Sequence, residues 1–301
     1  MKNERIFITG GAGFLGKNLV EKLYDDNEIT VYSRDESKHY YMKKDYPNVN
    51  FVIGDVRDRN FLIRKSRGHT VGIFAASLKQ IGACNDNYEQ ATRTIIDGAF
   101  NSRISAEENN FKSACFISTD KSRSATTLYG AMKFVAGEGF IAGQSSCKLT
   151  SAIYGNVMGS TGSIIPLMLE SVKKGRTLSL YGTDMTRFLL SVEDAIDLVM
   201  KSVNYEGCNI IPVAKSFKVL DLFEIYRERF GLQYRIALPR VGEKIHEIMA
   251  SKPPLKYREN KIYISWNDTT LERYQTRNNI HAWNAEQNLD AATINPPSKP
   301  D

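Results

Sequence analysis

Tyr129 and Lys133 stand four residues apart in the run Tyr-Gly-Ala-Met-Lys. Positions i and i+4 lie on one face of a helix, so a helix here places the ammonium one turn from the phenol. A positive charge at that distance favours the phenolate, and such a phenol can act as a base near neutral pH. The pair predicts a site that moves a proton to or from a hydroxyl group.

A second reactive group, Thr119-Asp120-Lys121, comes shortly before this pair and directly after an apolar run. Open α/β sheets bind ligands at the carboxyl ends of their strands, which is where this group should lie. Oxidation of a carbinol needs little beyond the Tyr and Lys pair. An extra acid and base fit a reaction that also moves a proton and expels a leaving group. The alternative is that Asp120 caps the next helix and Lys121 is solvated.

Near the N-terminus, Gly10, Gly13 and Gly16 form G-x-x-G-x-x-G between an apolar run and a helical pattern. In a dinucleotide site these glycines give a tight turn, let the backbone approach the pyrophosphate and allow close packing of helix and strand. Phe14 and Leu15 begin the helix, so we expect backbone N–H groups here to hold phosphates. The alternative is a glycine-rich turn without a ligand.

The type of dinucleotide depends on the residues that follow the second and third apolar runs. A carboxylate directly at the tip of the second strand would bind the ribose 2′-hydroxyl of NAD. Here Ser33 and Arg34 come first and suit a 2′-phosphate, so we predict NADP; Asp35 keeps NAD open as the alternative. Asp55 and Val56 are expected beside the adenine, unless Asp55 is a helix N-cap.

Apolar runs and helical patterns alternate along the chain, which is typical of βαβ units. The expected strands cover 5–9, 29–32, 49–53, 71–75, 114–118 and 149–154. The expected helices cover 14–24, 85–108, 129–143, 164–174, 192–203 and 219–230. The fold class is therefore α/β, a Rossmann-like doubly wound parallel sheet with a smaller C-terminal substrate-binding α/β lobe.

We expect the dinucleotide-binding domain to consist of residues 1–158 and 189–215. The substrate-binding lobe should consist of 159–188 and 216–290. Residues 291–301 are polar and rich in proline, so we expect a flexible tail.

Composition narrows the class of partner. The net charge of +6 favours anionic ligands, but the Lys and Arg residues are dispersed, so we predict no nucleic-acid partner. The cysteines have no C-x-x-C or metal-ligand spacing, which predicts no metal site. No apolar run reaches the roughly 18 residues that span a bilayer, and the N-terminus does not read as a signal peptide. We expect a cytoplasmic protein.

Several short motifs resemble the extended short-chain dehydrogenase/reductase family of UDP-N-acetylglucosamine 4,6-dehydratases, of the C5-inverting flagellin-glycosylation and capsule type. Besides the run from Thr119 to Lys133, they are Tyr-Ser-Arg-Asp-Glu at 32–36, Gly-Asp-Val-Arg-Asp at 54–58, Ala-Ala-Ser-Leu-Lys at 75–79, Tyr-Gly-Asn-Val at 154–157, Gly-Ser-Thr-Gly-Ser at 159–163, Met-Thr-Arg-Phe at 185–188 and Gly-Glu-Lys-Ile-His-Glu at 242–247. Together they cover about residues 4–250.

The resemblance implies a role for each reactive residue. Tyr129 would remove the proton of the C4 hydroxyl while hydride passes to the nicotinamide, whose ribose Lys133 can reach. Lys121 would take the C5 proton, Asp120 would protonate the departing C6 hydroxyl and Thr119 would hold a substrate hydroxyl. Hydride would then return to C6, giving a UDP-2-acetamido-2,6-dideoxy-4-keto-hexose and the original cofactor.

The resemblance also implies a set of binding residues and an assembly. Ala75 and Ala76 would contact the cofactor, and a UDP-N-acetylhexosamine substrate would contact Lys79, Asn156, Val157, Arg187, Arg240 and Glu243. Arg187 and Arg240 suit bidentate phosphate recognition, although each can also be a surface charge. A homodimer or higher homo-oligomer is implied, with helices near 85–108 and 129–143 as its faces.

The chain departs from the family pattern at Phe74, 93–94, 124–127 and Val241, which concern cofactor support and loop shape. Two other functions stay open. A nucleotide-sugar 4-epimerase or dehydrogenase would not need Asp120 and Lys121. A catalytically silent dinucleotide-binding regulator would not need the intact acid–base set.

Overall fold

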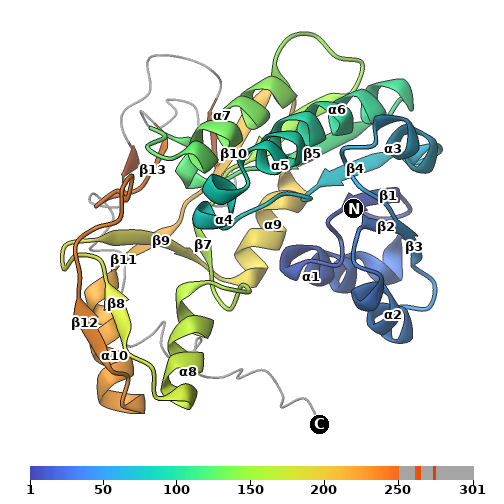
Figure 1. Cartoon of the computed structure of the whole chain (residues 1–301). Helices are drawn as coiled ribbons and strands as arrows, with labels where there is room; N and C mark the ends of the chain where they lie inside the picture. Colours follow the sequence, from blue (N-terminus) through green and yellow to red (C-terminus); the bar gives the residue numbers. More distant parts are fainter. Residues whose placement is uncertain (251–261, 266–273, 276–301) are drawn as a thin grey trace.

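The apolar runs form the centre of one large sheet. The computed structural model describes residues 1–250, 262–265 and 274–275, and in this part an eight-stranded sheet has the order β14-β10-β6-β5-β4-β1-β2-β3 (Figure 1). All neighbours from β3 to β10 are parallel, and only β14 runs antiparallel. The strands are β1 (Arg5–Thr9), β2 (Glu28–Ser33), β3 (Asn50–Ile53), β4 (Val71–Phe74), β5 (Ser113–Ile117), β6 (Lys148–Ala152), β10 (Cys208–Pro212) and β14 (Ile262–Ser265). The predicted Rossmann-like fold is confirmed.

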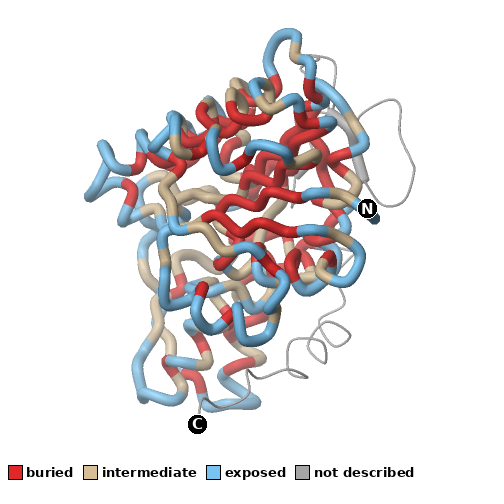
Figure 2. Tube along the Cα trace, turned by 90° about the vertical axis from the view of Figure 1, so that its right-hand side faces the viewer, coloured by how far each residue is buried: buried red, intermediate tan, exposed pale blue. Residues whose placement is uncertain are grey.

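Helices cover both faces of this sheet, because successive strand residues point to opposite sides. In β1, Ile6 and Ile8 pack into one core and Phe7 into the other. Figure 2 shows the strands as the most continuously buried part of the chain. The first core receives α1 (Phe14–Leu23), α2 (Glu36–Asp45) and α9 (Val192–Ser202). The second receives α3 (Arg59–Ser66), α4 (Ile81–Asp86), α5 (Tyr88–Thr92), η2 (Arg93–Asp97), α6 (Gly98–Glu108) and α7 (Leu128–Ile141).

A smaller lobe has a separate core and lies at the lower left in Figure 1. Its core is built on α8 (Ile164–Lys174) and α10 (Val219–Phe230), both of which have the predicted bounds. Short strands complete it: β7 (Asn156–Val157), β8 (Leu178–Leu180), β9 (Thr186–Leu190), β11 (Lys215–Lys218) and β12 (Tyr234–Ile236). Next come β13 (Ile248–Ala250) and β15 (Tyr274–Gln275), which pair with each other. Most of residues 251–290 and the expected tail at 291–301 lie outside the described residues.

The structure corrects some predicted elements. The helix expected over 85–108 is interrupted between α4 and α5, because Asn87 leaves the helical conformation with φ −128° and ψ 49°. From α5 the chain continues through the π-helical turn η2 into α6. The short strand β7 was not predicted. Two short single-turn helices, η1 (Tyr24–Asp26) and η3 (Asp120–Ser122), were not predicted. None of the helices in the described part is long and apolar enough to cross a membrane.

Candidate active site

The glycine loop between β1 and α1 leaves no room for side chains at Gly10 and Gly16. Gly10 has φ +68°, and a Cβ atom there would lie 2.8 Å from the nitrogen of Ala76. A Cβ on Gly16 would lie 2.4 Å from the Cα of Gly11, so α1 packs directly on the turn. Gly13 is the N-cap of α1, is exposed and forms no side-chain cap. The first N–H groups of α1 therefore remain open to an anion, and this cradle fits the pyrophosphate of a dinucleotide.

The predicted cofactor-selecting residues lie at the tips of β2 and β3. The Oγ of Ser33 lies 2.6 Å from Nε2 of His39, and Arg34 is exposed. Asp35 does not extend freely from the strand: it caps α2 through the backbone nitrogen of Lys38 and pairs with the Lys38 ammonium at 2.8 Å. A nearby carboxylate suited to a ribose hydroxyl is thus already engaged.

Asp55 is held by arginines. Its carboxylate accepts a 2.9 Å hydrogen bond from Nε of Arg57 and lies 3.8 Å from Nη1 of Arg34. Partial burial opposes ionisation, but the bonds from Arg57 outweigh it and hold the pKa of Asp55 below its usual range. The alternative that Asp55 is a helix N-cap is wrong, because Asp58 caps α3.

Three other predicted cofactor residues follow β3 and β4. Val56 is buried, and its side chain would contact any Cβ placed on Gly98 of α6. Ala75 and Ala76 are half-buried after β4, where their backbone nitrogens donate to the carbonyl and hydroxyl oxygens of Thr9. They lie next to Gly10, so the tip of β4 forms one wall of the cradle.

Tyr129 and Lys133 both lie on the buried side of α7, which begins after Thr127 caps it through the nitrogen of Gly130. Nζ of Lys133 donates a 2.7 Å hydrogen bond to the carbonyl oxygen of Ile117 and lies 4.6 Å from the centre of the Phe116 ring. Burial lowers the pKa of Lys133 to about 7. Burial raises the pKa of Tyr129 to about 12, and Lys121 is the charge that most opposes this rise. Without a bound cofactor, the positive charge that favours the Tyr129 phenolate is therefore that of Lys121 rather than that of Lys133.

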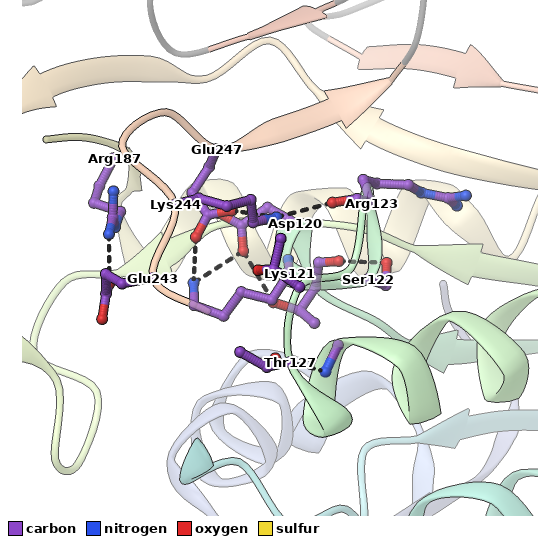
Figure 3. A network of polar contacts seen from close by, with 12 residues as sticks. Asp120, Lys121, Ser122, Arg123, Thr127, Arg187, Glu243, Lys244 and Glu247 are labelled. Carbon is purple, nitrogen blue, oxygen red and sulfur yellow. Dashed lines mark hydrogen bonds and ion pairs between the residues drawn. The ribbon is translucent and has the colours of Figure 1, made fainter. Parts of the chain in front are cut away.

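The residues after β5 form a buried acid–base pair (Figure 3). Oδ1 of Asp120 accepts from the hydroxyl of Thr119 at 3.0 Å and lies 3.2 Å from Nζ of Lys121. The alternative that Asp120 caps the next helix is wrong, because Asp120 is 0% exposed and Thr119 and Thr127 cap η3 and α7. Oδ2 of Asp120 is buried beside Gly155 and accepts no hydrogen bond from any described residue.

The charge states of this pair follow from its surroundings. Burial raises the pKa of Asp120, and the nearby Glu247 carboxylate adds to the rise. Burial opposes the charge of Lys121, but the carboxylates of Asp120 and Glu247 outweigh it and raise its pKa. Both shifts extend to higher pH the range in which the pair holds a proton, which suits delivery of a proton to a leaving group.

Residues 240–247, which we call the strap, cross the pair from the smaller lobe. Lys244 and Glu247 of the strap were not predicted as site residues, although Glu247 lies 3.6 Å from Lys121. Lys244 donates at 2.8 Å to the carbonyl oxygen of Arg123. Gly242 has φ +79°, and a Cβ there would lie 2.7 Å from the carbonyl oxygen of Thr126, so the strap lies directly on the loop before α7. The sequence signal for these residues was the run at 242–247, one of the motifs that carry the family resemblance.

The two predicted phosphate-binding arginines differ in availability. Arg187 is buried, its Nη1 donates to Thr186 and Ile245 carbonyl oxygens, and its Nη2 lies 2.6 Å from Glu243. Arg240 is exposed, pairs with Glu243 at 3.1 Å and lies 4.4 Å from the Tyr181 ring centre. Arg187 thus fastens the strap, whereas Arg240 is open to a ligand.

The remaining predicted substrate residues lie on neighbouring segments. Lys79 donates to the carbonyl oxygen of Thr161 at 2.5 Å. Asn156 and Val157 form β7, which pairs with β9, the strand that carries Arg187. A cavity of about 260 Å³ lies between α4 and the strap, and its walls include Asn85, Lys121, Glu243 and Glu247.

Two features lie apart from this chemistry. A cavity of about 490 Å³ at the amino ends of the strands is lined by Arg5, Glu28 and His69, and by none of the predicted site residues. Within the described ranges, no group of three or more His, Cys, Asp or Glu side chains is arranged to hold a metal ion.

The chain is similar to known proteins over most of its length. The model of a family described as "Polysaccharide biosynthesis protein" matches residues 6–265. The inverting UDP-N-acetylglucosamine 4,6-dehydratase of Campylobacter jejuni is 35% identical over 261 residues, which are 82% of this chain and 78% of that protein. A protein of Rickettsia akari named UDP-glucose 4-epimerase is 31% identical over 266 residues, which are 83% and 78% of the two chains.

Solved structures share the fold at lower identity. Pen from Bacillus thuringiensis has a TM-score of 0.86 at 24% identity, with 97% of this chain and 98% of that chain covered. The dTDP-glucose 4,6-dehydratase of Streptomyces venezuelae, solved with NAD, has a TM-score of 0.70 at 20% identity, with 80% and 86% covered.

Proposed function

The chain belongs to the polysaccharide biosynthesis protein family, and from that premise we propose that it is a nucleotide-sugar 4,6-dehydratase acting on UDP-N-acetylglucosamine. The observation that carries the proposal is the buried contact of 3.2 Å between Asp120 and Lys121, beside Tyr129. A dehydrogenase or epimerase has no use for this acid and base. Elimination of water needs both.

The first step removes two hydrogens from C4 of the sugar. A bound nicotinamide would accept a hydride and later return it, which lets one cofactor serve repeated turnovers. Tyr129 takes the hydroxyl proton, and the Lys121 ammonium favours the phenolate that can do so. Lys133, whose Nζ is bonded to the carbonyl oxygen of Ile117, would hold the nicotinamide ribose.

The second step removes water across C5 and C6. Once C4 is a ketone, the C5 proton is acidic, and Lys121 takes it. Asp120 gives its proton to the C6 oxygen, so the hydroxyl leaves as water. Its raised pKa supports this role, as does its Oδ2, which accepts no hydrogen bond from the described part of the chain. Thr119 holds a substrate hydroxyl, and Arg240 binds the diphosphate.

We propose NADP as the cofactor. Asp35 is occupied by Lys38, whereas Arg34 is exposed at the tip of β2 and available to a 2′-phosphate. Phe14, Leu15, Asp55, Val56, Ala75 and Ala76 complete this proposed site. Lys79, Asn156, Val157, Arg187 and Glu243 complete the proposed substrate site.

The assembly and location are proposals of the same kind. We propose a homo-oligomer through α5–α7, whose outer side exposes Tyr88, Leu128, Phe134 and Val135. Apolar side chains gathered on neighbouring helices are typical of an interface.

We also propose that the enzyme is cytoplasmic, that residues 1–158 and 189–215 bind the dinucleotide, and that 159–188 and 216–290 form the substrate lobe.

Incubation of the purified protein with UDP-N-acetylglucosamine, followed by mass spectrometry and proton NMR, tests the function. The proposal expects a UDP-sugar lighter by one water. UDP-N-acetylgalactosamine of unchanged mass would instead indicate a 4-epimerase, the activity for which the Rickettsia relative is named. Binding of dinucleotide without any turnover would indicate a regulator.

A further inference from the structure

Glu247 is a buried carboxylate with two lysine partners. It stands directly before β13, is 3% exposed, and its Oε1 and Oε2 lie 3.6 Å and 2.7 Å from the ammonium groups of Lys121 and Lys244 (Figure 3). Lys244 is in turn bonded to the backbone of Arg123, just after η3. The carboxylate thus reaches the acid–base pair from the smaller lobe.

Charged groups face Lys121 from several elements. Asp120 approaches from η3, Tyr129 from α7, Arg187 from β9 and Glu247 from the strap. Arg187 is paired with Glu243, and Tyr129 is a neutral phenol at rest. Glu247 is therefore the second negative charge beside Lys121, and Lys244 is the positive charge that most directly limits its effect.

We propose that Glu247 is a positioning residue for the acid–base pair: it holds Lys121 against Asp120 and keeps one proton on the two of them over the working pH range. The inference rests on the proposed dehydratase function. It assigns Glu247 no contact with the substrate and no step of its own.

One proton on the pair is what elimination requires. Transfer of a proton from Lys121 to Asp120, across 3.2 Å, converts the ion pair into a neutral acid and a neutral amine. The amine then takes the C5 proton, the C5–H electron pair becomes the C5–C6 double bond, and the C6–O bond breaks as Asp120 protonates the oxygen. Water leaves, and the ion pair is restored.

Glu247 sets the pH range in which Asp120 and Lys121 together hold that single proton. A negative charge within about 4–6 Å raises the pKa of an acid or ammonium group by about one or more. Without Glu247, Asp120 and Lys121 would both lose protons at lower pH. Although burial opposes it, the charges of Lys121, Lys244 and Arg187 hold the pKa of Glu247 itself below the usual value, so the carboxylate stays ionised.

The test compares pH profiles of kcat/KM for the full chain with its bound cofactor, using release of water as the assay. Glu247→Gln should move both limbs of the profile to lower pH by about one pH unit. Lys244→Met should move them to higher pH, because it removes the opposing charge. Glu247→Asp should restore the wild-type position, and Glu170→Gln, at an exposed pair on α8, should leave it unchanged.

A second readout does not depend on turnover. The carboxyl carbon signal of Asp120, assigned as the aspartate signal missing in Asp120→Asn, can be titrated by NMR. Its midpoint should fall in Glu247→Gln and rise in Lys244→Met. Unmoved limbs and midpoints in both variants, with only a lower maximal rate, would overturn the inference. A wild type that never releases water would overturn the proposed function instead. The NMR titration would still show whether Glu247 raises the pKa of Asp120.

Discussion

Nζ of Lys133 lies 2.7 Å from the carbonyl oxygen of Ile117, the last residue of β5. This bond joins α7, which carries Tyr129, to the strand that leads into Thr119, Asp120 and Lys121. The two halves of the proposed chemistry are therefore fixed to each other through one buried amine. The cost of that arrangement is a lysine held where its charge is poorly solvated.

That cost should be visible in stability. Lys133→Met, measured on protein freed of nucleotide, should be more stable than the wild type near pH 6. The pKa of Lys133 falls from 10.5 to about 7 on folding, so above pH 7 the unfolded chain binds the extra proton. Wild-type stability should then rise relative to the variant by about 1.4 kcal/mol per pH unit up to about pH 10.

Urea unfolding at a series of pH values measures this difference. Lys173→Met, at an exposed position of α8, is the control and should run parallel to the wild type. If the difference in unfolding free energy between wild type and Lys133→Met does not change between pH 7 and pH 10, folding does not lower the pKa of Lys133 and the prediction is wrong.

Asp120→Asn should separate oxidation from elimination. The amide keeps the shape of the side chain but has no acidic proton for the C6 oxygen, so release of water should fall by about a hundredfold or more. Binding of UDP-N-acetylglucosamine, measured by calorimetry, should persist. Asp45→Asn, at an exposed position in α2, should keep full activity. Full activity in Asp120→Asn as well would exclude the proposed acid.

Two glycine variants should have different effects. In Gly16→Ala the new methyl group would lie 2.4 Å from the Cα of Gly11, so the free energy of unfolding should fall by about 1–3 kcal/mol. In Gly13→Ala the nearest atom is the carbonyl oxygen of Gly10 at 3.1 Å, and the fold should survive. Dinucleotide affinity should nevertheless drop, because the methyl group stands at the open N-terminus of α1.

Denaturant unfolding and fluorescence titration with the dinucleotide separate these effects. Equal loss of stability in both variants would mean that the close approach at Gly16 is not what the structure indicates. Unchanged dinucleotide affinity in Gly13→Ala would place the phosphates elsewhere.

Arg34→Ala tests the choice of cofactor. Loss of a guanidinium that binds the 2′-phosphate should weaken NADP by about tenfold and leave NAD nearly unchanged. Lys43→Ala removes an exposed positive charge from the last turn of α2 and serves as the control. Tighter binding of NAD than NADP by the wild type would contradict the proposal and favour the alternative in which Asp35 binds the ribose of NAD.

The parts of this site that follow one another in sequence were predictable. Gly10 to Gly16 and Thr119 to Lys121 each follow a buried strand, and parallel strands bring their carboxyl ends to one edge. The amphipathic helix α10 was predicted to the residue. In contrast, α2 escaped prediction because only His39 and Met42 of its residues are buried, so it shows no apolar period.

Contacts between distant segments were not predictable in the same way. Nothing local to the strap shows that Glu247 faces Lys121 while Arg240 faces outward; that depends on how the smaller lobe folds back. Arg187 was predicted from its type to bind phosphate, and the structure commits its nitrogens to Glu243 and two carbonyl oxygens. Likewise, the helix expected over 85–108 breaks at Asn87, and segments on both sides of the break, α4 and η2, contact α7.

The most direct test of the central claim is incubation of the enzyme with UDP-N-acetylglucosamine in D2O, followed by mass spectrometry and proton NMR. We predict a product that has lost one water and carries deuterium at C5, because Lys121 exchanges its proton with solvent between taking and returning it. A product of unchanged mass, with inversion at C4 and hydrogen retained at C5, would contradict the account.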